Sequence, residues 1–157
     1  MTRLYGWGPK NQRLIDHVPH SHWITTSVIF ALRSDGVFAV HVMEGAMNHA
    51  KFLEYIRDIL GPMLRPGDVV TCDNLSVHKG KDVADLLATF GATQEFIPPY
   101  SSDENPIENS ISKVKSVIAK REIREIPELR EFLGNVPELF TPAECCHYFQ
   151  HAGYCSQ

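Results

Sequence analysis

The sequence predicts an α/β domain in which helices pack on a mixed β-sheet. Two alternating apolar segments near the start predict an antiparallel hairpin. Short apolar strands then alternate with amphipathic helices, which is typical of α/β crossovers. The chain of 157 residues is 43% hydrophobic and 22% charged, as expected for one domain with a single core. No run approaches eighteen apolar residues, so we expect no membrane span.

The hairpin is predicted over residues 22–43. Within "HWITTSVIFAL", Ile24, Val28 and Phe30 recur on one face at period two. The turn "RSDG" leads into the return segment "VFAVHVM". The preceding segment "MTRLYGWGPKNQRLIDHVPH" offers one further strand at its start.

The middle of the chain alternates helix and strand. Residues 48–60, "NHAKFLEYIRDIL", carry apolar residues at helical spacing and predict an amphipathic helix. Pro62, Pro66 and Gly67 are expected to end it. The run "DVVTCD" predicts a short buried strand that ends on Asp73. The polar loop "NLSVHKG" then leads to a helix near 81–90.

The last third of the sequence is mostly helical. Residues 93–97, "TQEFI", predict a strand closed by two prolines. An apolar stripe predicts a helix from the "NPIE" segment to about residue 121. Two shorter helices follow at about 127–133 and 142–150, so the order is β-β-α-β-α-β-α-α-α.

Two carboxylates are candidates for chemistry. Asp73 ends a strand, where functional groups gather in α/β sheets, although Asp73–Asn74 is also ordinary turn chemistry. Glu108 stands three residues after Asn105, where Asn, Pro and Glu form a capping box that explains the motif without chemistry. The same pattern recurs before Glu144. Glu108 lies one residue off the buried stripe, which predicts a position at the rim of the sheet–helix interface.

Several segments resemble one family. "DVVTCDNLSVHKG" and "FIPPYSSDENPIENSISKVK" are similar to the catalytic domain of the mariner-related insertion-sequence transposases of the DDE superfamily. "RLYGWGPKNQR", "LRPGDVV" and "FTPAECCHYFQHAGY" extend the resemblance over nearly the whole chain. The 34 residues between Asp73 and Glu108 match the spacing of that family's second and third carboxylates.

The resemblance implies a ribonuclease H-like mixed sheet flanked by helices, formed by residues 1–157 as one catalytic domain. It implies DNA strand cleavage and transfer through two Mg²⁺ (or Mn²⁺) ions, with transposon ends and target DNA as partners and a homo-oligomer in the complete transposase. Asp73 and Glu108 match the metal-binding acids. The residues matched to site-supporting or phosphate-contacting positions are Asn74, His78, Lys79 and Asn105, and the nearby Lys113 and Lys115 could steer the DNA backbone.

The family places its first catalytic Asp on a strand upstream of "RLYGW". We therefore expect the first, central strand, its Asp and the helix-turn-helix DNA-binding region to be missing from residues 1–157. The chain alone is then expected to bind metal weakly and to leave DNA uncut, because two carboxylates offset little of the repulsion between two divalent ions. Its unpaired strands are expected to destabilise it, to promote self-association, or to recruit the N-terminal part as a separate segment.

Other functions remain open at the level of sequence. The alternative is a non-catalytic transposase remnant that contacts DNA or oligomerises, and a third possibility is another metal-dependent nuclease of the same fold. A net charge of −4 argues against a domain whose main role is to bind DNA through a broad basic surface. The run "CCHYFQHAGYC" offers zinc ligands, although packing of a terminal helix explains it better, and "HVPHSH" is best explained as a solvated loop. The start shows no signal-peptide pattern, so a cytoplasmic protein with reduced thiols is expected.

Overall fold

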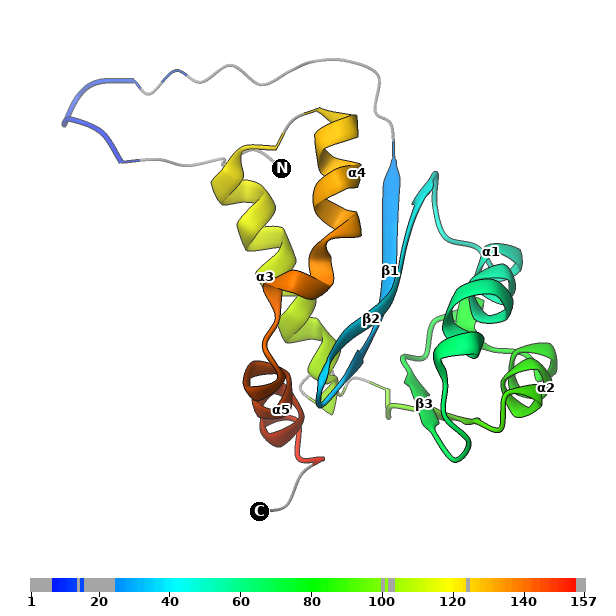
Figure 1. Cartoon of the computed structure of the whole chain (residues 1–157). Coiled ribbons are helices and arrows are strands. Elements are labelled where there is room, and N and C mark those ends of the chain that lie inside the picture. Colours follow the sequence, from blue (N-terminus) through cyan, green and yellow to red (C-terminus); the bar gives the residue numbers. More distant parts are fainter. Residues whose placement is uncertain are drawn as a thin grey trace.

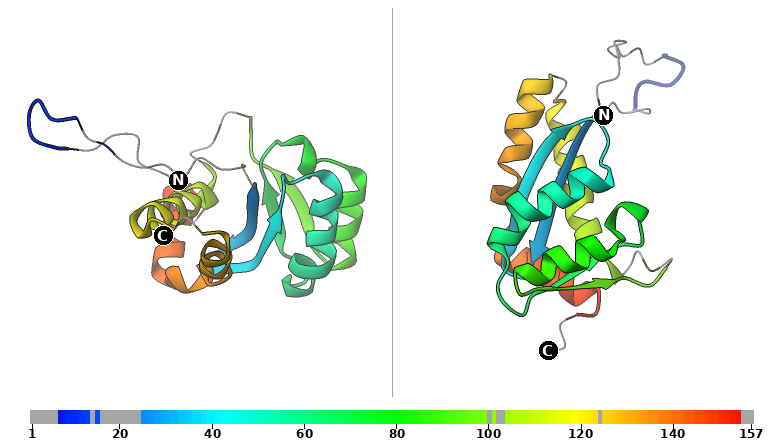
Figure 2. Two further views of the ribbon diagram at one scale, coloured as in Figure 1. Left: turned by 90° about the horizontal axis from the view of Figure 1, so that it is seen from above. Right: turned by 90° about the vertical axis from the view of Figure 1, so that its right-hand side faces the viewer.

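The computed structural model describes residues 7–13, 15, 25–99, 101, 104–123 and 125–154. Within these ranges the elements follow the predicted order (Figure 1). Helices lie on both sides of the strands (Figures 1 and 2). No helix in these ranges is both long and apolar enough to span a bilayer. The additional strand predicted at the start of the chain falls on residues 1–6, outside the described ranges.

The predicted hairpin is confirmed. Strand β1, Thr26–Arg33, pairs antiparallel with β2, Gly36–Glu44, through a turn at residues 34–35. The register shifts between Ile29 and Ala31, and opposite this shift Ala39 adopts a positive φ of 52°, the signature of a β-bulge. The Tyr55 hydroxyl donates to the Ala39 carbonyl at 2.8 Å, so the bulge is held by a helix beneath it.

The first helix is longer and less regular than predicted. Helix α1, His49–Tyr55, begins at the N-cap Asn48, whose side chain accepts from the Lys51 amide at 2.9 Å. It continues as a π-helical turn over Ile56–Leu60 and a 3₁₀ turn over Gly61–Met63. The helical stretch runs three residues past the predicted range 48–60 and ends before Pro66 and Gly67. Pro62 is accommodated because a proline in the first positions of a new 3₁₀ turn loses no intrahelical hydrogen bond.

The second pair of strands is parallel. Strand β3, Val69–Cys72, pairs with β4, Thr93–Phe96, through the crossover helix α2, Lys81–Thr89. The prediction that β3 is buried is wrong. Val69 is 53% exposed, and only the alternate residues Val70 and Cys72 pack against a core. In the described structure β3 has a neighbouring strand on one edge only, and the face that carries Val69 and Thr71 is exposed.

Helices cover both faces of the hairpin (Figures 1 and 2). On one face lie α3, Pro106–Arg121, α4, Ile126–Gly134, and α5, Pro142–His151, around a core that includes Phe30, Val114 and Val136. On the other face lie α1 and α2, around a second core that includes Ile56 and Leu87. The side chains of β1 alternate between the two cores, so this strand lies in the middle layer of the domain.

The strands that the structure describes form two separate two-stranded sheets, β1–β2 and β3–β4. Arg33, the last residue of β1, connects them: its guanidinium donates to the Asp68 carboxylate at 2.5 Å and to the Met63 carbonyl at 3.1 Å. Asp68 directly precedes β3. The end of β1 is thereby fixed beside the start of β3 without any backbone ladder between the two.

Candidate active site

Asp73 follows the last residue of β3, as predicted. One carboxylate oxygen, Oδ1, accepts from the Leu75 amide at 3.1 Å and lies 2.7 Å from Nδ1 of His78. The Asp73 side chain is 42% exposed. The second oxygen, Oδ2, has no hydrogen-bond partner within the described part of the chain, so it is free to bind a ligand.

His78 is held rigidly in position. Its side chain is only 17% exposed, and its ring packs against Phe52 of α1 with the ring centroids 4.5 Å apart. The Gln94 side chain donates to the His78 carbonyl at 2.8 Å, which ties this loop to β4. Because Nδ1 faces a carboxylate oxygen, which can only accept, the His78 ring donates a hydrogen bond from Nδ1 to Asp73. The result is a carboxylate with a fixed orientation at the end of the strand.

Asn74 secures the carboxyl ends of the two parallel strands. Its side-chain amide donates to the Ile97 carbonyl, and the Ile97 amide donates to the Cys72 carbonyl at 2.9 Å. Burial raises the pKa of the Cys72 thiol, because the charged thiolate is disfavoured inside the protein. The Asp73–Asn74 step is therefore both a turn and a means of positioning Asp73.

Glu108 lies in the first turn of α3. Asn105 is the N-cap, and its side chain accepts from the Ile107 amide at 3.4 Å, while Pro106 occupies the first helical position. Capping thus explains Asn105, as predicted. Glu108 is exposed, so the prediction of a rim position is wrong. Its carboxylate makes no hydrogen bond or ion pair to any other residue that the structure describes, and the exposed Lys115 lies on the same side of α3.

Lys113 has a different environment from the one the sequence suggested. Its ammonium donates to both carboxylate oxygens of Glu144, at 2.8 and 2.6 Å, and to the Leu139 carbonyl at 2.6 Å. It also lies 4.7 Å from the centre of the Phe140 ring. All three donors of the ammonium are used, so contact with a phosphate does not fit this geometry. Lys113 joins α3 to α5. Lys79, by contrast, is exposed in the loop after Asp73.

The structure adds a residue that the sequence did not suggest. His49, at the start of α1, places Nδ1 3.0 Å from the Val77 carbonyl and Nε2 2.8 Å from the Asp82 carboxylate. The hydrogen bond to Asp82 raises the pKa of His49, assisted by the bond to Val77. His49 therefore braces the loop that carries His78. No local pattern indicates this contact, because its partners are about 30 positions away along the chain.

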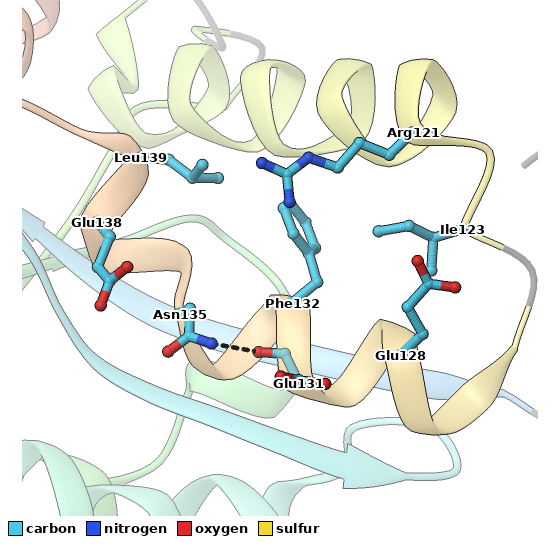
Figure 3. A pocket seen from close by; sticks show the side chains of 8 residues that line it. All are labelled: Arg121, Ile123, Glu128, Glu131, Phe132, Asn135, Glu138 and Leu139. Carbon is cyan, nitrogen blue, oxygen red and sulfur yellow. Dashed lines mark hydrogen bonds between the residues drawn. The ribbon is translucent and has the colours of Figure 1, made fainter.

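The "HVPHSH" segment and Cys155 lie outside the described residues, so only residues 145–154 of the second candidate zinc site are described. Cys145 is fully buried in the core beside α3, which agrees with helix packing of "CCHYFQHAGYC". Within the described ranges, no three His, Cys, Asp or Glu side chains lie together as a metal site. A pocket of about 400 Å³ lies between the end of α3 and α4, with Arg121 over the Phe132 ring (Figure 3). None of the predicted site residues lines it.

The fold and the carboxylate at the end of β3 define an α/β domain of the ribonuclease H-like class. The profile of the DDE superfamily endonucleases matches residues 1–130. The chain belongs to this family. No curated protein matches the chain by sequence.

Solved structures agree with this assignment at the level of the fold. The Mos1 transposase paired-end complex with left transposon end has a TM-score of 0.75 and 16% identity, over 94% of this chain and 46% of that chain. The catalytic domain of Mos1 mariner transposase has a TM-score of 0.60 and 14% identity, over 81% of this chain and 74% of that chain. The Mos1 transposase catalytic domain with Raltegravir and Mg has a TM-score of 0.59 and 16% identity, over 81% of this chain and 75% of that chain. The chain thus spans about half the length of the transposase in the first complex.

Proposed function

We propose that residues 1–157 form the catalytic part of a DDE transposase, which cuts and joins DNA strands by metal-dependent phosphoryl transfer. The observation that carries the proposal is the geometry of Asp73. His78 and the Leu75 amide hold one of its oxygens, and the other is free at the carboxyl end of a parallel strand. Ligands of α/β proteins bind at this edge.

The available donors fit a divalent cation such as Mg²⁺ or Mn²⁺. Asp73 and Glu108 supply hard carboxylate oxygens, which these ions prefer over sulfur or nitrogen. A divalent ion bound there would activate the attacking oxygen and stabilise the leaving oxygen of the phosphodiester. The Mos1 mariner paired-end complex with Mn and the Mos1 catalytic domain with Raltegravir and Mg support the same choice of metal.

The surrounding residues have separate tasks in this proposal. His78 orients Asp73 by donating from Nδ1, and Asn74 holds the strand end through the Ile97 carbonyl. The exposed Lys79 and Lys115 contact DNA phosphates, since neither makes an ion pair with another described residue. The proposed partners are transposon-end and target DNA, bound by a homo-oligomer in the cytoplasm, and the Mos1 paired-end complexes support the DNA partner.

Paramagnetic broadening by Mn²⁺ tests the metal site directly. In an isotope-labelled chain, Mn²⁺ should broaden the amide signals around Asp73 and around Glu108. The variants Asp73→Asn and Glu108→Gln should lose this effect. Asp85→Asn is the matched control, because Asp85 is an exposed carboxylate on α2, remote in sequence from both.

The result of this experiment distinguishes a catalytic transposase domain from a non-catalytic one. If Mn²⁺ broadens neither region, the chain lacks the metal site and the proposed catalytic role fails, leaving a non-catalytic DNA-contacting or oligomerising domain. We expect the isolated chain to leave DNA uncut, because two carboxylates are a weak site for two divalent ions. Mn²⁺-dependent nicking that disappears in Asp73→Ala would contradict that expectation.

A further inference from the structure

We propose that the doubly protonated ring of His49 is a positioning residue for Asp73, and that the ring releases this hold when it loses one proton. The ring holds the 3₁₀ turn over Ser76–His78 against α1, and this turn carries the histidine that orients Asp73. The consequence for metal binding rests on the proposed function, whereas the positioning of the carboxylate stands without it.

Both ring nitrogens of His49 face groups that accept hydrogen bonds. Nδ1 lies 3.0 Å from the Val77 carbonyl, and Nε2 lies 2.8 Å from the Asp82 carboxylate. The hydrogen bond with His49 lowers the pKa of Asp82, so this carboxylate has no proton to donate at neutral pH. A neutral imidazole carries one N–H, whereas an imidazolium carries two. The protonated ring is therefore the form that donates to both partners.

Loss of one proton from His49 breaks the contact with the turn and keeps the contact with Asp82. The remaining proton stays on Nε2, because a hydrogen bond to a charged carboxylate is stronger than one to a neutral carbonyl. Nδ1 then presents a lone pair to the Val77 carbonyl oxygen, and two acceptors at this distance repel each other. His49 stays paired with α2, while the turn loses its hydrogen bond to α1.

One face of α1 makes both contacts to the turn. His49 and Phe52 are three positions apart in α1, so their side chains lie on the same face. The His49 ring contacts the Val77 carbonyl, and the Phe52 ring packs on the His78 ring with the centroids 4.5 Å apart. Helix α1 therefore holds two successive residues of the turn, and the contact made by His49 is the one that depends on protonation.

The turn connects His49 to Asp73 through short contacts. His78 Nδ1 donates to Asp73 Oδ1 at 2.7 Å, and the Leu75 amide donates to the same oxygen at 3.1 Å. The His78 amide donates to the Leu75 carbonyl at 3.1 Å, so the two groups that hold Asp73 belong to one hydrogen-bonded turn. A shift of Val77 away from α1 therefore moves both groups, and the carboxylate moves with them.

The loop also passes close to the His49–Asp82 pair. Gly80 has a φ of 151°, and a Cβ placed there would overlap the Asp82 carboxylate and lie 3.2 Å from Cε1 of His49. Glycine is therefore required at this position. Because the backbone packs directly on the ion pair, the arrangement of the pair and the path of the loop depend on each other.

Asp82 is the charge that controls the protonation of His49 in the described part of the chain. It faces the ring from α2, and its negative charge favours the imidazolium. On α1 itself, the Lys51 ammonium is directed to backbone carbonyls at and after the end of β2. In the loop, the His78 ring donates to its own carboxylate, and the lysines on either side of Gly80 are exposed.

Nuclear magnetic resonance of the metal-free chain tests the positioning directly. The ring signals of His49 report its own protonation, and the Leu75 amide signal reports the Asp73 oxygen to which it donates. In wild type, the Leu75 signal should change with pH at the same midpoint as the His49 ring. In Asp82→Asn, which removes the charge beside His49, both midpoints should fall by the same amount.

Two substitutions separate His49 from the other histidines. In His49→Gln, the Leu75 signal should lose the step at the His49 midpoint and keep any step caused by His78. His151→Gln is the matched control, because His151 is exposed at the end of α5, which packs on the face of the hairpin opposite α1. It should leave the Leu75 titration unchanged. Circular dichroism confirms that each variant folds.

Either of two results overturns the proposal. The Leu75 midpoint could stay constant in Asp82→Asn while the His49 midpoint falls. The step in the Leu75 signal could also persist in His49→Gln. In both cases the protonation of His49 is not transmitted to the groups that hold Asp73.

Mn²⁺ titration extends the test to the proposed metal site. Relative to His49→Gln, the Mn²⁺ affinity of wild type should fall about ten-fold, as for a group that orients a metal ligand, between about pH 6 and about pH 8.5. Metal sites ordinarily show the reverse trend, because protons compete for their ligands in acid. The comparison with His49→Gln removes any effect of pH that the two chains share.

The two measurements distinguish this inference from the proposed function. If Leu75 follows His49 and Mn²⁺ binds at no pH, the positioning role stands and the proposed metal chemistry fails. If Mn²⁺ binds with the same pH dependence in wild type and His49→Gln, the metal site is intact and the inference that His49 acts on it is wrong.

Discussion

His78 offers the sharpest single test of how this site is built, because its two contacts can be removed separately. The ring packs on Phe52, and Nδ1 donates to Asp73. The variant His78→Phe keeps an aromatic ring against Phe52 and loses the hydrogen bond. The variant His78→Asn keeps a side-chain N–H donor near the position of Nδ1 and loses the ring.

The expected magnitudes follow from those contacts. Loss of a group that orients a metal ligand costs about 10–100-fold in metal affinity, equivalent to about 1.4–2.8 kcal/mol. We expect His78→Phe to show this loss of Mn²⁺ affinity and to unfold at nearly the wild-type urea concentration. His78→Asn should keep Mn²⁺ affinity within about three-fold and lose about 0.5–1.5 kcal/mol of stability, the value of an aromatic pair.

The assay is water-proton relaxation during Mn²⁺ titration, with urea unfolding followed by circular dichroism on the same samples. If His78→Phe binds Mn²⁺ as tightly as wild type, then His78 does not position Asp73. If both variants lose affinity and stability together, the loop has collapsed and the two contacts cannot be treated as independent.

Three further predictions concern stability. Arg33→Met should lower the free energy of unfolding by about 1.5–3 kcal/mol in urea titrations, because it removes the guanidinium that pairs with the partly buried Asp68 carboxylate. An unchanged unfolding midpoint would show that the contact between the two sheets contributes nothing to stability. Burial alone would raise the pKa of Glu144, but hydrogen bonds from Lys113 and Tyr148 outweigh it and hold the pKa below its ordinary value of 4.5. The contribution of Glu144 to the free energy of unfolding is therefore present above pH 4.5 and is lost as the pH falls through the folded-state pKa. Glu144→Gln should therefore flatten acid unfolding monitored by circular dichroism, and an unaltered acid transition would contradict this. The raised pKa of His49 has the opposite effect: its contribution to stability is complete below its ordinary pKa of 6.5 and is lost as the pH rises through the folded-state pKa. The protection factors of the amides in residues 76–80, measured relative to their intrinsic exchange rates, should therefore fall at alkaline pH in wild type but not in His49→Gln, and protection factors that do not change with pH in wild type would contradict this.

Local patterns predicted most of the elements correctly. Alternation in residues 26–44 is enough to specify a hairpin, and the structure confirms it. The N-cap of α3 follows from Asn105 and Pro106 alone, because capping is chemistry within one turn. Asp73 was located by the same kind of evidence, since a short β-branched run ends there.

The sequence predicted burial and side-chain pairing less well than it predicted the elements. An apolar run such as "VVTC" predicts a buried strand, but burial also requires neighbours on both sides, and β3 has one in the described structure. Lys113 lies in a basic run typical of an exposed helix face. Only the packing of α5 against α3 brings Glu144 to it, from 31 positions away.

The sequence by itself determined the order of the elements and the family, and it singled out Asp73 and Glu108 as candidate carboxylates, because these depend on patterns a few residues long. The tertiary structure decided how those carboxylates are presented. It placed His78 on Phe52 so that one oxygen of Asp73 is held and the other is free, and it left Glu108 exposed at the start of α3. It also divided the strands into two sheets joined by Arg33 and Asp68. These contacts join residues distant along the chain, so they form only when the helices pack on both faces of the hairpin.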